Sequence, residues 1–230
     1  MKSSTASVAR LNARPAPHSQ SGGAGVAHLD IESKRGALLY APESALKRAV
    51  APLAVLLHGA GGNAEHGLGI LNAYADEAKL ILLAPESRKT SWDIISDAQY
   101  GPDVRFIDKC LDEVFSRYAI DPERIAIGGF SDGASYALSL GLSNGSLCRY
   151  ILAFSPGFMA PVRIEGQPRI FISHGIQDQV LPIDACSRKL VRVLRGHDLS
   201  LDYREFDGAH TVPAEMKERA LELFLGEAPH

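Results

Sequence analysis

Short apolar runs, separated by stretches of helical periodicity, constrain the fold of this chain more than any other feature. The runs are Leu53–Leu57, Leu80–Leu83, Ile125–Ile127, Ile151–Phe154 and Ile170–Ile172. Strands that are apolar on both faces are typical of a parallel sheet covered by helices, whereas half-exposed strands alternate apolar and polar residues. The sequence therefore predicts a mostly parallel sheet buried between two helical layers.

Apolar residues at helical spacing lie between these runs. Steps of three and four residues connect Val104, Ile107, Leu111, Val114 and Tyr118. Further helices are expected near 66–79, 132–144, 183–196 and 213–225, and further strands at Val26–Ile31, Gly36–Ala41 and Leu199–Phe206. This alternation predicts a three-layer α/β fold with right-handed crossovers, in which ligands bind beyond the carboxyl ends of the strands.

Composition excludes several other classes of protein. The 230 residues suit one large domain, and 46% hydrophobic with 22% charged residues is ordinary globular usage. A net charge of -3 gives no basic excess for nucleic acid, and no apolar run approaches the roughly 18 residues of a membrane span. Cys110, Cys148 and Cys186 form no C-x-x-C pair, which favours a reducing, cytoplasmic location and no metal site.

The first residues differ in composition from the rest of the chain. Residues 1–29 contain no acid and carry a charge of +3, whereas the remainder holds 21 basic and 27 acidic residues. The segment is rich in Ser, Ala, Gly and Pro, and it lacks the apolar region of a secretory signal. We expect a flexible tail over 1–25 and one α/β domain over 26–230. A transit peptide is the alternative, but no apolar helical face is visible.

A nucleophile motif follows the third of the five apolar runs. Gly129-Phe130-Ser131-Asp132-Gly133 has the form G-x-S-x-G and lies between a predicted strand and a predicted helix. The glycines avoid collisions at a strained turn, and the helix presents its N-terminal N–H groups to developing negative charge. A structural tight turn is the alternative, but the strand–turn–helix context favours Ser131 as a nucleophile.

A serine nucleophile needs a base, and the base needs an orienting acid. Nucleophile-elbow enzymes supply them later in the chain, in the order acid and then histidine. Asp178 follows the strand ending at Ile172, and His210 follows the strand ending near Phe206. Ser131, Asp178 and His210 therefore fall in the required order, each after the end of a predicted strand.

Each of these assignments has a rival. Asp184 is an alternative acid, but it lies where a helix begins and acidic caps are common. His197 is an alternative base, but it resembles the cation that often follows a helix. His174 lies near the expected site, and we interpret it as a structural residue that holds the loop.

A glycine-rich loop, His58-Gly59-Ala60-Gly61-Gly62-Asn63, follows the first apolar run. Acyl transfer requires N–H donors for an oxyanion, and one donor is the residue after the nucleophile, here Asp132. The second comes from the loop after the third strand, where Ala60 is the first choice and Gly61 the next. A phosphate loop is disfavoured because neither G-x-x-x-x-G-K-[ST] nor G-x-G-x-x-G is present.

Taken together, these motifs resemble the phospholipase/carboxylesterase family of α/β-hydrolases, which includes acyl-protein thioesterases and small bacterial carboxylesterases. The resemblance spans about residues 36–226 and rests on Leu56-Leu57-His58-Gly59, Tyr118 to Ile125, Gly129-Phe130-Ser131, His174 to Asp178, Val180-Leu181-Pro182 and His210 to Pro213. It implies Ser131, Asp178 and His210 as a triad, with oxyanion donors at Ala60 and Asp132. The expected fold is an α/β-hydrolase domain without a cap.

Two positions depart from the pattern of the family. Thioesterase members usually carry a bulkier residue at the position of Ala60 and a glutamine at that of Asp132. An acid directly after the nucleophile would disfavour anionic substrates. Depolymerase-like and feruloyl-type esterases are similar as well, so the subfamily stays open.

The expected activity is hydrolysis of a small carboxylic ester through an acyl-enzyme, without a cofactor. Thioesterase, lysophospholipase and peptidase activity on the same fold are alternatives, as is a non-catalytic binding protein. Gly61, Trp92, Phe130, Phe158 and Met159 are candidate substrate-pocket residues, and ordinary core packing is the alternative for the four larger side chains. No sequence feature indicates an oligomeric state.

Overall fold

The computed structural model describes residues 8–16, 21–32 and 35–226, and a mixed sheet forms its centre. In these residues the sheet has eight strands in the order β1-β2-β4-β3-β5-β6-β7-β8. They are β1 (Gly25–Leu29), β2 (Ala37–Ala41), β3 (Ala51–Leu57), β4 (Ile81–Pro85), β5 (Ile120–Phe130), β6 (Tyr150–Phe154), β7 (Arg169–Gly175) and β8 (Leu201–Phe206). β2 pairs antiparallel with β1 and β4, and every other pairing is parallel, as the apolar runs predicted.

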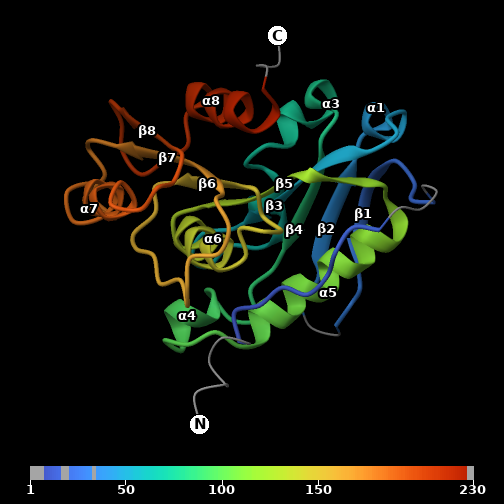
Figure 1. Cartoon of the computed structure of the whole chain (residues 1–230), viewed down its shortest axis with the longest axis horizontal. Helices are drawn as coiled ribbons and strands as arrows, with labels where there is room; N and C mark the ends of the chain where they lie inside the picture. The colour runs from blue at the N-terminus through green and yellow to red at the C-terminus, as the bar shows by residue number, and fades with distance from the viewer. Residues whose placement is uncertain (1–7, 17–20, 33–34, 227–230) are drawn as a thin grey trace.

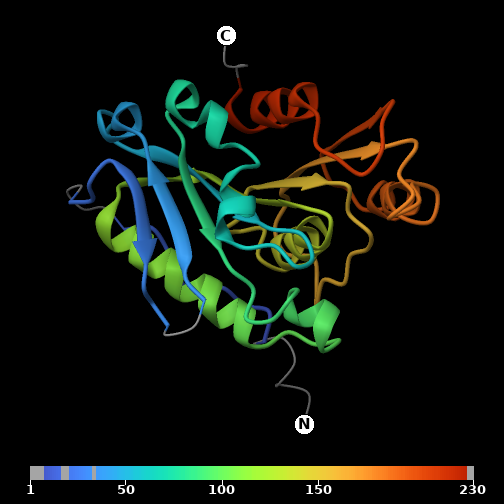
Figure 2. The ribbon, with the colours of Figure 1, turned by 180° about the vertical axis from the view of Figure 1, so that it is seen from behind.

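Helices cover both faces of the sheet (Figures 1 and 2). They are α1 (Glu43–Leu46), α2 (Ala64–Leu68), α3 (Ala75–Ala78), α4 (Asp93–Ser96), α5 (Pro102–Arg117), α6 (Asp132–Ser143), α7 (Ser187–Leu194) and α8 (Ala214–Leu225). Successive strand residues point to opposite faces, so Val55 packs in the core beneath α5 and α6, while Leu56 packs in the core beneath α2 and α8. The three-layer α/β fold is confirmed. None of the helices in the described residues has both the length and the apolar character needed to cross a bilayer.

The helix predicted over 66–79 is divided into shorter pieces. α2 ends at Leu68, a 3-10 turn covers Asn72–Tyr74, and α3 follows directly. Gly67 packs tightly on β3, since a Cβ atom there would lie 2.6 Å from the Leu56 carbonyl oxygen. Lys79, with a φ of 52°, ends α3 in the left-handed conformation.

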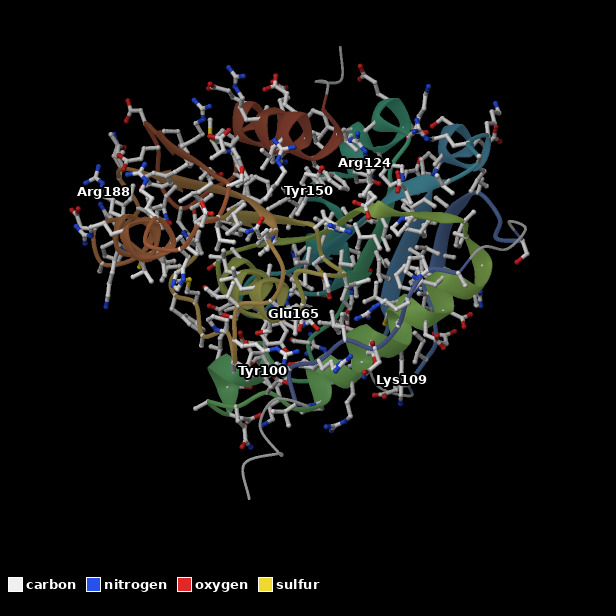
Figure 3. All side chains as sticks on the ribbon, viewed as in Figure 1. Tyr100, Lys109, Arg124, Tyr150, Glu165 and Arg188 are labelled. Carbon is white, nitrogen blue, oxygen red and sulfur yellow. The ribbon has the colours of Figure 1, made fainter. Side chains whose placement is uncertain are left out.

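The last helix, α8, is held against the sheet by residues of β5 and β6. The Arg124 guanidinium donates to the Phe224 carbonyl at 3.0 Å, and so satisfies a group that the helix leaves unpaired. The rings of Tyr150 and Phe224 meet edge to face, 5.0 Å apart. Figure 3 labels Arg124 and Tyr150 in the region near α8.

The expectation of a flexible tail over 1–25 is wrong for residues 8–16, here named the N-terminal strap. Ala9, Leu11 and Ala13 are buried in the same core as α5 and α6. The Asn144 side chain accepts the Leu11 N–H at 2.9 Å and donates to the Ala9 carbonyl at 2.7 Å. Asp108 of α5 accepts the Ala13 N–H at 2.9 Å. The strap therefore ties α5 to the end of α6, and in Figure 1 it runs alongside α5.

Candidate active site

Ser131 occupies a sharp turn between β5 and α6. Its φ of 58° and ψ of -119° are strained for a residue with a side chain. A Cβ atom at Gly133 would lie 2.1 Å from the Leu57 carbonyl oxygen, and one at Gly129 would lie 2.6 Å from it. Both motif glycines are therefore required because β3 passes too close for any side chain.

The three residues predicted as a triad come together beyond the carboxyl ends of β5, β7 and β8. His210 Nε2 lies 2.9 Å from Ser131 Oγ, and His210 Nδ1 lies 2.6 Å from Asp178 Oδ2. Because a carboxylate can only accept, Nδ1 carries the proton and Nε2 is free to accept from the serine. Gly175 allows this approach, since a Cβ there would lie 2.3 Å from the Gly208 carbonyl oxygen in the loop that carries His210.

Asp178 is held in a fixed orientation by several donors. Its Oδ1 accepts the N–H groups of Val180 and Leu181 at 2.9 and 2.8 Å, while Oδ2 faces His210. Burial acts to raise the pKa of Asp178, but the hydrogen bonds from Leu181 and His210 outweigh it and hold that pKa below its ordinary value. The carboxylate is therefore ionised and cannot rotate without breaking these bonds.

His174 supports Asp178 from beneath, in agreement with its interpretation as a structural residue. Its Nε2 lies 2.8 Å from the Leu181 carbonyl and 3.1 Å from Asp178 Oδ2, and its Nδ1 lies 2.6 Å from Ser187 Oγ. Burial lowers the pKa of His174, so the ring is neutral. Two acceptors face Nε2, which therefore carries the proton, and the Ser187 hydroxyl donates to Nδ1.

Two backbone N–H groups near Ser131 have no acceptor among the residues that the structure describes, those of Ala60 and Asp132. The Gly61 N–H instead donates to the Thr90 carbonyl at 2.7 Å, which argues against Gly61 as the alternative donor. His58 fixes this loop, because its Nδ1 lies 2.7 Å from the Gly59 carbonyl and its Nε2 accepts the Ser87 N–H at 3.0 Å. Burial lowers the pKa of His58, as a neutral ring with one donor and one acceptor requires.

Trp92 does not line an open pocket. Its side chain is 0% exposed, and its ring stacks on Tyr136 with centroids 5.1 Å apart. The indole Nε1 donates to the His58 carbonyl at 2.9 Å. Trp92 therefore supports the glycine-rich loop from below, and ordinary packing is the correct alternative for this residue.

Two buried carboxylates that no sequence motif marks, Asp93 and Asp103, hold the segments on either side of Trp92. Asp103 accepts the N–H groups of Arg88 and Asp93 at 2.5 and 2.7 Å. Asp93 in turn accepts the Gly101 N–H at 2.8 Å and the Tyr136 hydroxyl at 2.9 Å. Burial raises the pKa of Asp103 to about 6 and also raises that of Asp93. Asp93 and Asp103 are ten residues apart in the sequence, so no local motif indicates that they interact.

Of the other candidate pocket residues, Phe130 is the one with a described contact to the proposed triad. Phe130 is half-buried and packs on the His210 ring, with centroids 4.5 Å apart. Phe158 and Met159 are half-buried on the loop between β6 and β7, and Met159 also packs against the core. Gly61 is exposed in the glycine-rich loop, next to Ala60.

The rival acid and base lie away from this geometry. Asp184 is exposed and pairs with Arg188 at 3.0 Å. His197 is exposed beyond the end of α7. The structure therefore brings neither of them to Ser131.

Comparisons with known proteins identify relatives that are described as esterases. A putative esterase, NocK, from Nocardia uniformis subsp. tsuyamanensis is 31% identical over 59% of this chain and 42% of its own length. A probable feruloyl esterase C from Aspergillus niger is 30% identical over 56% of this chain and 49% of its own length. The chain thus spans about half the length of these curated relatives.

A solved structure shares the fold. The CE1 ferulic acid esterase from Anaeromyces mucronatus matches with a TM-score of 0.65 at 18% identity, over 94% of this chain and 98% of that one. The family model for phospholipase/carboxylesterase matches residues 102–222, just over half of the chain and a segment that contains Ser131, Asp178 and His210. The chain belongs to the phospholipase/carboxylesterase family of α/β-hydrolases.

Proposed function

We propose that this chain is a serine esterase that hydrolyses small carboxylic esters. The observation that carries the proposal is the continuous hydrogen-bonded series from Ser131 Oγ through His210 to Asp178, at 2.9 and 2.6 Å. A hydroxyl needs this assistance because it is a weak nucleophile at neutral pH. Family membership and the named esterase relatives support the same activity.

The first half of the reaction forms an acyl-enzyme. His210 Nε2 takes the Ser131 proton as Oγ attacks the ester carbonyl carbon, and the carbonyl oxygen becomes an oxyanion. The N–H groups of Ala60 and Asp132 hold that oxygen. The intermediate then collapses, the carbon–oxygen bond to the alcohol breaks, and His210 gives its proton to the departing alcohol oxygen.

The second half releases the acid. Water loses a proton to His210 as it attacks the acyl carbon, and Ser131 recovers its proton when the acyl bond breaks. Asp178 remains ionised throughout and stabilises the charged form of His210. The 14 residues between β6 and β7 contain neither helix nor strand, which favours esters that reach an open site without a cap. We place this activity in the cytoplasm, where the buried, unpaired thiols of Cys110, Cys148 and Cys186 would remain reduced.

Replacing Ser131 by Ala tests the proposal. We expect kcat for a p-nitrophenyl ester of a short acid to fall by about 10^4- to 10^6-fold, because the nucleophile is lost. Ser155→Ala is a matched control, since Ser155 also has a left-handed φ of 52° at a strand end and its hydroxyl has no partner among the described residues. Near-wild-type turnover by Ser131→Ala would overturn the proposal.

Esters of aromatic acids are a second candidate substrate class. The observation that favours them is the similarity to proteins described as feruloyl and ferulic acid esterases. The ratio of kcat/KM for methyl ferulate to that for methyl butyrate separates this class from short alkyl esters. Matched thioester and amide substrates test the thioesterase and peptidase alternatives in the same assay.

A further inference from the structure

Asp132 places a carboxylate next to the proposed nucleophile. It follows Ser131 directly, begins α6 and is half-buried. Its Oδ2 accepts the Ser91 hydroxyl at 2.5 Å, and Ser91 is itself only 8% exposed. The acid therefore has a defined position at the start of α6, where the helix N-terminus stabilises its charge.

In the part of the chain that the structure describes, no cation is paired with this carboxylate. Among the described residues no Lys, Arg or His pairs with Asp132, whose partner is a neutral hydroxyl. The cations of the adjacent segments are committed to other acids: Arg35 to Glu86 at 3.3 Å, Arg88 to Glu32 at 3.5 Å and Lys89 to Asp97 at 2.5 Å. The negative charge at this point is therefore open to a ligand.

The second carboxylate of the site is not available in the same way. Asp178 is 5% exposed, and its oxygens are taken by Val180, Leu181, His174 and His210. The charge of Asp178 stabilises the His210 imidazolium that forms during the reaction. Asp132 is thus the acid of the two that can act on a bound substrate, since no cation is paired with it among the described residues.

We infer that Asp132 makes the site select esters that carry a cationic group, such as an ammonium, over neutral esters of the same shape, and neutral esters over anionic ones. The inference rests on the proposed esterase function. The carbonyl oxygen would bind the N–H of Asp132 itself, so the rest of the ester lies within one side-chain length of the carboxylate. At such short range a unit charge changes the binding of another by several-fold, even in water.

A structural role for Asp132 makes a different prediction. Its bond to Ser91 also ties α6 to the loop whose Thr90 carbonyl holds Gly61. Asp132→Asn keeps the backbone N–H, the side-chain size and an oxygen that accepts from Ser91, but removes the charge. A structural role therefore predicts equal changes for all substrates, whereas an electrostatic role predicts a change that depends on substrate charge.

The test uses p-nitrophenyl esters of three acids of similar length. 4-(Trimethylammonio)butanoate is cationic, 5,5-dimethylhexanoate is its neutral isostere, and glutarate leaves a free carboxylate. A second pair, acetylcholine and 3,3-dimethylbutyl acetate, places the charge in the alcohol instead. The two arms show whether the cation lies on the acyl side or the alcohol side of the ester.

We expect the cationic-to-anionic ratio of kcat/KM to fall on the order of tenfold in Asp132→Asn. Glu43→Gln is the control for net charge, because Glu43 is exposed beyond the end of β2, at the opposite edge of the sheet from the triad. This control should leave the ratio unchanged. In the unaltered protein, raising NaCl from about 0.05 to about 0.5 M should lower the same ratio, since salt screens exposed charges.

The outcomes distinguish this inference from the function beneath it. If the neutral ester is hydrolysed through Ser131 but the ratio is the same in the unaltered protein and in Asp132→Asn, the inference is wrong and the esterase proposal stands. If no ester is hydrolysed, the function itself fails. If Asp132→Asn is too slow to assay, the salt dependence of the unaltered protein is the test. A cationic-to-anionic ratio of kcat/KM that does not change with salt then overturns the inference.

Discussion

Asp178→Asn is expected to lower kcat by about 10^4-fold, the size of loss that an Asp-to-Asn change causes in serine hydrolases with the same triad. The hydrogen bonds around Asp178 dictate the orientation of the new amide. Val180 and Leu181 both donate to Oδ1, so the amide oxygen must occupy that position. The amide nitrogen then faces His210 Nδ1 and donates to it. The His210 proton must move to Nε2, which can no longer accept from Ser131.

The same amide also lowers stability. Its nitrogen faces the Nε2–H of His174, so two donors meet where a donor met an acceptor. We expect a loss of about 1–3 kcal/mol in the free energy of unfolding, measured in urea, with the fold retained. Asp184→Asn is the matched control, because Asp184 is exposed and forms an ion pair with Arg188 on the surface. Equal kcat values for the two variants would rule out Asp178 as the orienting acid.

A chain that begins at Ser21 is expected to lose about 3–5 kcal/mol of unfolding free energy relative to the full chain. The loss follows from the N-terminal strap, whose Leu11 is fully buried and whose backbone satisfies Asn144 and Asp108. Without the strap these polar groups and the apolar surface of α5 face water. Urea unfolding followed by circular dichroism measures the change.

Point variants separate this effect from truncation in general. Leu11→Ala should cost about 2–4 kcal/mol, whereas Val8→Ala, at a side chain that is 43% exposed, should cost little. The catalytic rate of the folded protein should change little, because Asn144 lies at the far end of α6 from Ser131, roughly 20 Å away at 1.5 Å per residue. An unchanged denaturation midpoint in the truncated chain would show that the strap contributes nothing.

Site residues that belong to a short motif, or that follow a strand directly, could be predicted from the sequence. The G-x-S-x-G motif predicts its own strained turn, because only glycine fits where Leu57 passes Gly129 and Gly133. Asp178 follows an apolar run and His210 follows the next predicted strand, and the carboxyl ends of parallel strands meet at one edge. The distances within this group then follow from the fold.

Features that depend on packing between distant segments could not be predicted in this way. Trp92 follows a strand as a pocket residue would, but its burial depends on Tyr136 and on the His58 carbonyl. The strap did carry a signal, since apolar Ala9, Leu11 and Ala13 alternate with polar residues. The Ser- and Pro-containing residues around the strap instead favour a flexible tail. Nothing in the sequence shows that the side chains of Asn144 and Asp108 form hydrogen bonds with the backbone of the strap.

The central claim is that Ser131 is the nucleophile, and a covalent adduct tests it most directly. The unaltered protein should be treated with a fluorophosphonate, digested and mapped by mass spectrometry, with a denatured sample as control. We predict one adduct per chain, on Ser131, formed only in the folded protein and prevented by a competing ester. A folded, pure protein that stays unlabelled, or that carries the adduct on another residue, would contradict the claim.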